Sequence, residues 1–283
     1  MALVELEDVS YSYPGGTLAV DRVSLAVAAG ESVAVIGQNG AGKTTTVKLM
    51  NGLLRPTSGT VRVDGVDTRT RTAAQVARRV GYVFQNPDDQ IFNSSVRREI
   101  AYGLRRLRLE PAEARRRLGE AADLAGLAGL LDENPHDLPL SVRKFVTIAS
   151  VLAVDPDAVV LDEPTAGQDR AGLERIAAIA AHLSARGRAV VTITHDMEFV
   201  ARHFTRVVVM AQRRVVRDGA AATIFGDAAA MTAARLAQRR VPSAVASVTV
   251  TSAGSGAGVG VPDSVVASPE DADRGSLDGH GGR

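Results

Sequence analysis

Hydrophobic and polar residues alternate along two short segments near the start of the chain. The segments are Leu3–Val9 and Val23–Val27, and alternation with a period of two predicts strands that are buried on one face. Thr60–Val63 is predicted as a further strand. Together they predict an antiparallel, β-rich flank in the amino-terminal part of the chain.

Other apolar segments are continuous rather than alternating. Ser32–Ile36 is a short apolar run that leads into a glycine-rich loop. Val80–Phe84, Ala158–Leu161 and Ala189–Ile193 are rich in β-branched residues, which is typical of parallel strands buried on both faces. These four runs predict the core of a second, mostly parallel sheet.

Two segments are predicted to be helical. Residues 42–52 follow the glycine-rich loop, and Gly52 is a suitable helix C-cap. Residues 94–131 are dominated by Arg, Leu, Ala and Glu. The order of these elements predicts an α/β fold, in which a mostly parallel sheet carries an antiparallel β amino-terminal flank and a helical insert at about residues 93–139.

Composition supports a folded protein and excludes some kinds of chemistry. The 283 residues are 45% hydrophobic and 23% charged, which is enough for a sizeable core. There is no cysteine, so disulfides, thiolate metal sites and cysteine nucleophiles are excluded. The net charge of +1 argues against binding to nucleic acid by charge alone.

The segment Pro242–Arg283 differs from the rest. It is rich in Gly, Ser, Ala and Val and has a net charge of −3, so that residues 1–241 carry +4. Such a composition predicts a disordered tail. We also expect no signal peptide in Met1–Ser10, and no membrane span, because apolar stretches such as Ile176–Leu183 are interrupted by charge.

A phosphate-binding loop follows the strand Ser32–Ile36. Gly37–Thr44 has the pattern Gly-x-x-x-x-Gly-Lys-Thr, with a strand before it and a helix after it. Its backbone N–H groups are expected to face phosphate oxygens. An ordinary glycine-rich turn is the disfavoured alternative. The candidate nucleotide-binding residues are Gly37, Gln38, Asn39, Gly40, Ala41, Gly42, Lys43, Thr44 and Thr45.

Two adjacent carboxylates follow the strand Ala158–Leu161. In a P-loop protein, Asp162 is expected to hold Mg²⁺ through water, and the Thr44 hydroxyl to ligate the same ion. Glu163 faces the other side of the strand and is placed to polarise an attacking water. The alternative is a solvated turn, and the presence of a phosphate loop in the same chain argues against it.

Two other polar residues end predicted strands. His195 follows the run Ala189–Ile193, at the strand end where α/β sheets place ligands. It is a candidate to orient Glu163 or the water, although a lone histidine is more often structural. Gln85 is a candidate contact for Mg²⁺ or water, and an ordinary turn residue is its alternative.

These motifs occur in the order that is found in ABC-type ATPases, which the chain resembles over about residues 1–225. The resemblance implies a P-loop NTPase core, ATP and Mg²⁺ as cofactors, and ATP hydrolysis. It also implies that Tyr13, in the segment Val9–Pro14, stacks on adenine. The alternative for Tyr13 is an exposed strand tyrosine.

The segment Val80–Gln90 resembles ATPase subunits of energy-coupling-factor importers for vitamins, cobalt or nickel. This narrower resemblance implies a second ATPase subunit and integral membrane subunits as partners, at the cytoplasmic face of the membrane. It places a groove for a membrane partner beside Gln85 and the helical insert. Arg105–Arg108 and Arg115–Arg117 are either solvated helix faces, which we favour, or membrane-proximal contacts.

The family's signature, Leu-Ser-Gly-Gly-Gln, is altered here to Leu140–Lys144. Ser141 matches and is expected to act on the partner's ATP, together with Val142 and Arg143. Arg143 and Lys144 are expected to compensate by charge for the missing glycines. In the loop after Asp162-Glu163, Asp169 matches the family, whereas Gln168 replaces the usual leucine.

The altered signature suggests a heterodimer whose partner supplies an intact one, and a homodimer with two unusual sites is the alternative. A non-transport ABC ATPase acting on ribosomes or DNA, and an inactive binding module, are the competing functions. Such non-transport ATPases usually carry two domains or long coiled coils, which this sequence lacks. We therefore expect no nucleic-acid partner, and the transported substrate does not follow from the sequence.

Overall fold

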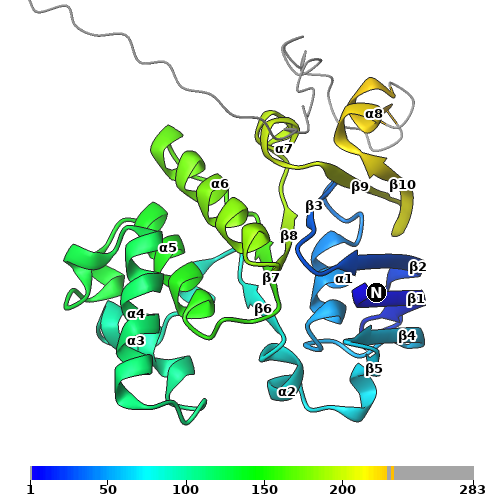
Figure 1. The fold of residues 1–283 in the computed structure, drawn as a ribbon. Coiled ribbons are helices and arrows are strands. Elements are labelled where there is room, and N and C mark those ends of the chain that lie inside the picture. Colours follow the sequence, from blue (N-terminus) through cyan, green and yellow to red (C-terminus); the bar gives the residue numbers. More distant parts are fainter. Residues whose placement is uncertain (1, 228–230, 233–283) are drawn as a thin grey trace, which may run out of the picture. The chain divides into compact units, whose positions relative to one another are not determined.

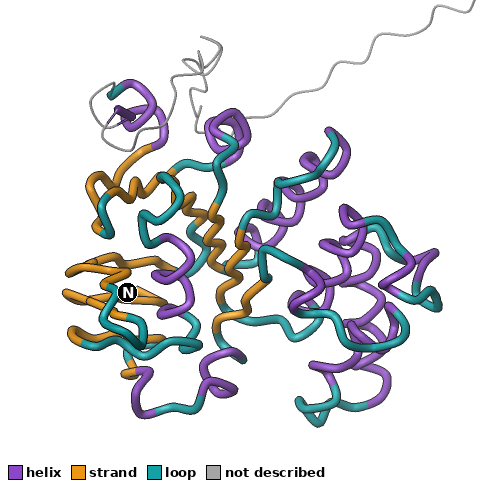
Figure 2. The backbone as a smooth tube through the Cα atoms, turned by 180° about the vertical axis from the view of Figure 1, so that it is seen from behind, coloured by secondary structure: helices purple, strands orange, loops and turns teal. Residues whose placement is uncertain are grey.

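The computed structural model describes residues 2–227 together with 231 and 232. Within these residues the strands form two separate sheets, which the ribbon and the tube show with helices between and beside them (Figures 1 and 2). The predicted tail Pro242–Arg283 and the predicted domain boundary at residue 241 lie outside the described residues.

The first sheet is antiparallel and comes from the amino-terminal flank. β1 pairs with both β2 and β4, which gives the strand order β2-β1-β4-β5. The predicted flank is confirmed, and its first two strands are longer than the alternating segments. The bounds are β1 Ala2–Ser12, β2 Leu18–Ala28, β4 Ser58–Val63 and β5 Val66–Asp67.

The second sheet has the strand order β10-β9-β3-β8-β7-β6. In the part of the chain that the structure describes, five of its strands are parallel, and β10 pairs antiparallel with β9 at one edge. The four continuous apolar runs are all strands of this sheet, as predicted. The bounds are β3 Ser32–Gly37, β6 Val80–Val83, β7 Ala158–Asp162, β8 Ala189–Ile193, β9 Arg206–Ala211 and β10 Arg214–Ala220.

The parallel sheet is buried on both faces because successive strand residues point in opposite directions. Val33 and Val35 of β3 belong to a core shared with the antiparallel sheet and α1. Ala34 and Ile36 belong to a second core, shared with the helices on the other face. All four side chains are fully buried, which explains why the run is apolar throughout rather than alternating.

The helices have unequal lengths and mostly cover the second core. α1 ends beside Gly52, whose φ of +73° fits the predicted helix end. No helix within the described ranges has the length and apolar character needed to cross a membrane. The bounds are α1 Lys43–Met50, α2 Ala73–Ala77, α3 Val96–Leu104, α4 Pro111–Ala125, α5 Leu140–Leu152, α6 Arg170–Ala185, α7 Met197–His203 and α8 Ala221–Gly226.

The predicted helical segment 94–131 is broken into α3 and α4, followed by a 3-10 turn at Ala128–Leu130. Arg108 has a left-handed backbone with φ of +51°, and Pro111 begins α4. The residue before a proline is disfavoured in a helix, so Glu110 is extended and the helix restarts. The region therefore forms a helical subdomain of α3, α4 and α5, which Figure 1 shows beside the parallel sheet.

Candidate functional site

The phosphate-binding loop joins β3 to α1, and two of its glycines are needed for close approach to other backbone. A Cβ at Gly37 would lie 2.1 Å from the carbonyl oxygen of Met210, and one at Gly42 would lie 2.6 Å from that of Ala19. Both glycines have positive φ, as does Gly40, which has open space around it. The backbone of Met210 and Ala19 therefore leaves no room for a side chain at Gly37 or Gly42 and fixes the shape of the loop at these positions.

Lys43 lies inside this loop rather than outside it. Its Nζ donates to the carbonyl oxygens of Gly37 at 2.8 Å and Gln38 at 2.9 Å. Burial lowers the pKa of Lys43, and the nearby carboxylates of Glu163 and Asp162 act in the opposite direction. The ammonium group is therefore held at the centre of the loop, next to two acidic side chains.

Asp162 is at the end of β7 and has a partner on each carboxylate oxygen. Thr44 Oγ1 donates to Oδ1 at 3.5 Å, and Tyr82 Oη donates to Oδ2 at 2.6 Å. Asp162 is only 3% exposed. Burial and the negative charge of Asp162 raise the pKa of Tyr82, so the phenol keeps its proton and acts as a donor.

The oxygen atoms of Thr44 and Asp162 suit a hard cation such as Mg²⁺. Among the described residues, no cluster of three or more His, Asp or Glu side chains is placed to hold a metal ion. These two side chains would hold such an ion together with phosphate and water oxygens, since Mg²⁺ usually keeps several waters beside nucleotides.

Glu163 contacts His195 directly. The distance from Glu163 Oε2 to His195 Nδ1 is 2.9 Å, and the imidazole is 70% exposed whereas the carboxylate is 12% exposed. Glu163 has a left-handed backbone with φ of +49°, and its N–H donates to the carbonyl oxygen of Ile193 at 2.9 Å. This backbone turn directs the carboxylate away from Asp162 and toward the end of β8.

Lys144 supports the same turn from α5. Its Nζ donates to the carbonyl oxygens of Glu163 at 2.9 Å and Ala166 at 2.7 Å. The side chain is 6% exposed, and burial lowers its pKa. The expectation that Lys144 supplies compensating charge at the signature is therefore wrong, because its amino group is buried against its own chain.

The other signature residues lie in the first turns of α5, which begins at Leu140 with Pro139 as its N-cap. The carbonyl oxygen of Ser141 accepts from Gln168 Nε2 at 3.1 Å, and Val142 is partly buried. Arg143 Nη1 donates to Asp88 Oδ1 at 2.8 Å. The altered signature is thus bonded to two loops of its own subunit.

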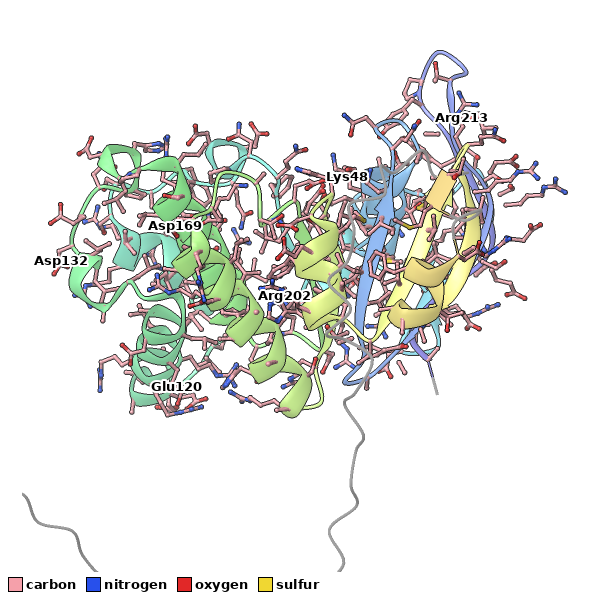
Figure 3. The ribbon with its side chains drawn as sticks, turned by 90° about the horizontal axis from the view of Figure 1, so that it is seen from above. Lys48, Glu120, Asp132, Asp169, Arg202 and Arg213 are labelled. Carbon is pink, nitrogen blue, oxygen red and sulfur yellow. The ribbon has the colours of Figure 1, made fainter. Side chains whose placement is uncertain are left out.

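Tyr13, Gln85 and Asp169 lie around the edges of the site. Tyr13 is 39% exposed, and its Oη lies 3.2 Å from Thr45 Oγ1, which joins it to α1. Gln85 is exposed in the bend after β6 and has no hydrogen-bond partner among the described residues. Asp169 is the N-cap of α6, where its Oδ1 accepts from Gly172 N–H at 2.8 Å (Figure 3).

The structure therefore brings most of the predicted residues together. Direct contacts link Thr44 to Asp162, Glu163 to His195, and Lys43 to its own loop. No direct contact joins Gln85 to this group. Sequence reasoning missed Tyr82 as a partner of Asp162, and the available signal was a hydroxyl within an otherwise apolar buried strand.

Known proteins resemble both the sequence and the fold. The family model described as ABC transporter matches residues 20–166. The energy-coupling factor transporter ATP-binding protein EcfA of Methanothermobacter thermautotrophicus is 40% identical over 228 residues, which are 80% of this chain and 73% of that protein. The cobalt import ATP-binding protein CbiO of Rhodobacter capsulatus is 40% identical over 231 residues, 81% of this chain and 82% of that protein.

A solved structure confirms the predicted fold class. It is that of cbiO1 from Clostridium perfringens, described as part of the ABC transporter complex cbiONQ. It superposes with a TM-score of 0.73 at 31% identity, and the match covers 80% of this chain and 91% of that one. The arrangement of two sheets and a helical subdomain is therefore shared with a protein of known structure.

Proposed function

Because the chain belongs to the ABC transporter family, we propose that it is the ATP-hydrolysing subunit of a membrane importer of the energy-coupling-factor type. The observation that carries the proposal is the contact between Glu163 and His195 beside the phosphate loop. The proposal is supported by the residue types present, since ATP hydrolysis in P-loop proteins uses a residue that positions water, a loop lysine and a carboxylate suited to Mg²⁺. The relatives support the importer class, since they are named as energy-coupling factor and cobalt import proteins.

The phosphate loop binds and orients the nucleotide. Lys43 exchanges its bonds to Gly37 and Gln38 for bonds to the β- and γ-phosphates. The backbone N–H groups at the start of α1 face the same oxygens. Tyr13, 39% exposed and joined to Thr45, stacks on the adenine.

Glu163 acts on the water that attacks the γ-phosphate. Thr44 and Asp162 would hold Mg²⁺, which would neutralise the charge that develops on the phosphates during hydrolysis. Glu163 accepts the proton of the attacking water, and His195 holds the carboxylate through Nδ1. A well-placed base contributes about 10²–10⁴-fold to such a rate. Gln85 joins this site as a contact for the metal or the water.

The partners are a second ATPase subunit and integral membrane subunits at the cytoplasmic face of the membrane. Ser141, Val142 and Arg143 belong to the surface that meets the second ATPase subunit, together with Asp169. The loop after Gln85 and the helical subdomain receive the membrane subunit. The cargo is a vitamin or a transition metal, in keeping with the cobalt import relatives.

The decisive experiment compares Glu163→Gln with Glu120→Gln in the complex assembled with its membrane subunits. Glu120 is an exposed residue of α4 that pairs with Arg116, so its change controls for the loss of one carboxylate. We expect Glu163→Gln to retain ATP binding and to lose about 10²-fold or more in turnover. Unchanged turnover would contradict the proposal.

The same preparation distinguishes the two kinds of dimer. If the purified chain alone hydrolyses ATP with a Hill coefficient near two, as expected for two coupled ATP sites, the subunit forms a homodimer. If activity requires a second ATPase subunit with an intact signature, the dimer is heteromeric. In that case Glu163→Gln removes ATP hydrolysis at the site that contains this chain's own phosphate loop.

A further inference from the structure

The two arginine-rich stretches of the helical subdomain differ in how they are paired. Arg116 bonds to Glu113 and Glu120, and Arg117 bonds to Glu113. These pairs lie three or four residues apart on α4, as in an ordinary solvated helix face. They agree with the interpretation that we favoured from the sequence.

Arg105, Arg108 and Arg115 are different. All three are exposed, and none of them forms an ion pair with an acidic side chain within the described residues. They come from three adjacent parts of the subdomain: the end of α3, the connecting loop and the first turns of α4. Their positive charges are therefore available to a binding partner of opposite charge.

These three arginines surround an apolar cleft of about 260 Å³ between α3 and α4. Apart from the arginines, the cleft is lined only by small or aliphatic side chains. The lining therefore combines apolar contact with three exposed guanidinium groups, and these arginines are called its rim below. The lining residues besides the arginines are Ala101, Leu104, Leu109, Ala114 and Leu118.

An exposed aromatic pair joins α3 to the loop that precedes it. Phe92 is 61% exposed and packs edge-to-face against Tyr102 of α3, with ring centroids 4.6 Å apart. The guanidinium of Arg106 lies over the Tyr102 ring at 5.5 Å, and its Nη2 donates to the phenol oxygen at 3.2 Å. Aromatic rings with a polar tip are enriched where membrane proteins meet lipid headgroups.

We propose that this arginine-rimmed cleft binds the headgroup region of an anionic phospholipid at the membrane surface. The phosphate contacts Arg105, Arg108 and Arg115, because guanidinium groups match phosphate oxygens well. The glycerol and first methylene groups enter the cleft over Leu109 and Leu118. An acidic peptide fits less well, because the floor of the cleft has no side-chain donor for its backbone carbonyls.

This contact goes beyond the proposed function, since it requires neither ATP nor the membrane subunits. It gives the ATPase subunit a direct attachment to the bilayer through the helical subdomain. A polybasic patch binds anionic membranes by charge and is weakened by salt. We therefore expect the attachment to prefer anionic lipid and to weaken as the salt concentration rises.

The test measures binding of the full chain to vesicles of phosphatidylcholine, with and without phosphatidylglycerol. The variant Arg105→Gln/Arg108→Gln/Arg115→Gln removes the rim. The matched control, Arg97→Gln/Arg202→Gln/Arg214→Gln, makes the same change in net charge at arginines paired with acids elsewhere. Any difference between the two variants then reports position rather than total charge.

We expect the wild-type chain to bind phosphatidylglycerol vesicles and not pure phosphatidylcholine. The rim variant should bind on the order of 100-fold more weakly, since each arginine near an anionic surface contributes roughly a factor of five. The control variant should lose much less. Equal losses in the two variants, or no preference for anionic lipid in the wild type, would overturn the proposal.

A fluorescent probe tests the location of the contact. The chain has no tryptophan, so Phe92→Trp provides a single reporter at an exposed position that packs on Tyr102, the residue after Ala101 of the cleft lining. Lipids brominated near the headgroup should quench it in the wild-type background and not in the rim variant. If vesicle binding leaves this tryptophan unquenched, or if the rim variant loses only its assembly with the membrane subunits in detergent, the cleft binds something other than lipid.

Discussion

Arg143 Nη1 donates to Asp88 Oδ1 at 2.8 Å, and this contact joins the first turns of α5 to the loop that follows Gln85. Gln90 makes a second link between the same two elements. Its Oε1 accepts from Phe84 N–H at 3.0 Å, and its Nε2 lies 3.4 Å from the carbonyl oxygen of Thr147 in α5. The loop and the signature helix are therefore linked by two side chains within one subunit.

The first prediction concerns this ion pair. Arg143→Ala and Asp88→Ala should each lower ATP turnover of the assembled complex, because either change removes one of the two links between the loop and α5. Folding stability should change by less than about 1 kcal/mol, since the two side chains are 21% and 43% exposed. Steady-state turnover and urea unfolding of the same variants measure the two effects.

The reversed pair provides the control. Arg143→Asp combined with Asp88→Arg restores an ion pair within the subunit, so its turnover should exceed that of either single reversal. The interaction energy that this double-mutant cycle gives for the activation free energy of turnover should be about 0.5–3 kcal/mol. If Arg143 acts only on the partner's nucleotide, the reversed pair will be as inactive as Arg143→Asp alone.

The parallel strands could be predicted closely because burial on both faces leaves a continuous apolar run. Ala189–Ile193 has the predicted bounds, and Val80–Phe84 differs from β6 by one residue. The break between α3 and α4 was not predicted, because the many Arg and Leu residues of the segment favour a helix and outweighed the signal of Pro111. The left-handed backbone of Arg108 depends on packing that residue preferences do not contain.

In the candidate site, too, the features set by local sequence could be predicted and those set by packing could not. The phosphate loop and Asp162-Glu163 are local patterns, so the sequence is sufficient to find them. The roles of Tyr82 and Lys144 depend on where their side chains end after other elements have packed, and each meets a partner far away in the chain. Lys144 was expected to compensate by charge at the signature, whereas its direction on α5 brings its amino group to Glu163 and Ala166.

Lys144→Met is the second prediction. The change keeps most of the side-chain volume and removes the amino group that binds the carbonyl oxygens of Glu163 and Ala166. Leaving these partly buried carbonyl oxygens without their charged donor should lower the free energy of unfolding by about 1–3 kcal/mol. It should also lower kcat more than it raises KM for ATP, because the turn that presents Glu163 loses its support.

Lys48→Met is the matched control, since Lys48 is a partly buried lysine of α1 (Figure 3) whose amino group makes no such bonds to the residues that the structure describes. Chemical denaturation and steady-state kinetics should separate the two variants. Equal stability and equal kcat for both would show that the contacts of Lys144 with Glu163 and Ala166 are unimportant.

His195→Ala is the third prediction. The imidazole is 70% exposed, so its removal should leave the free energy of unfolding nearly unchanged. Loss of the Nδ1 contact frees the Glu163 carboxylate, and kcat should fall by about 10²-fold or more while the affinity for ATP is kept. His136→Ala, at another exposed histidine, should have wild-type kinetics. A kcat within twofold of wild type for His195→Ala would contradict the role of the contact.

Tyr82→Phe is the fourth prediction, and it has a pH dependence. The change removes the donor to Asp162 Oδ2 in a site where the carboxylate is 3% exposed. The free energy of unfolding at neutral pH should therefore fall by about 1–3 kcal/mol. Tyr102→Phe, at a 37% exposed tyrosine, should have a smaller effect.

The sign of the pH effect follows from the raised pKa of Tyr82. The folded chain keeps the phenol proton above pH 10, whereas the unfolded chain releases it near that value. The stabilisation from this proton is therefore complete below pH 10 and declines as the pH rises further. Phenylalanine has no proton to lose, so the difference in unfolding free energy between wild type and Tyr82→Phe should narrow above pH 10. Urea unfolding at neutral pH and above pH 10 measures this difference. A difference that widens with pH would contradict the role of Tyr82 as a proton donor to Asp162.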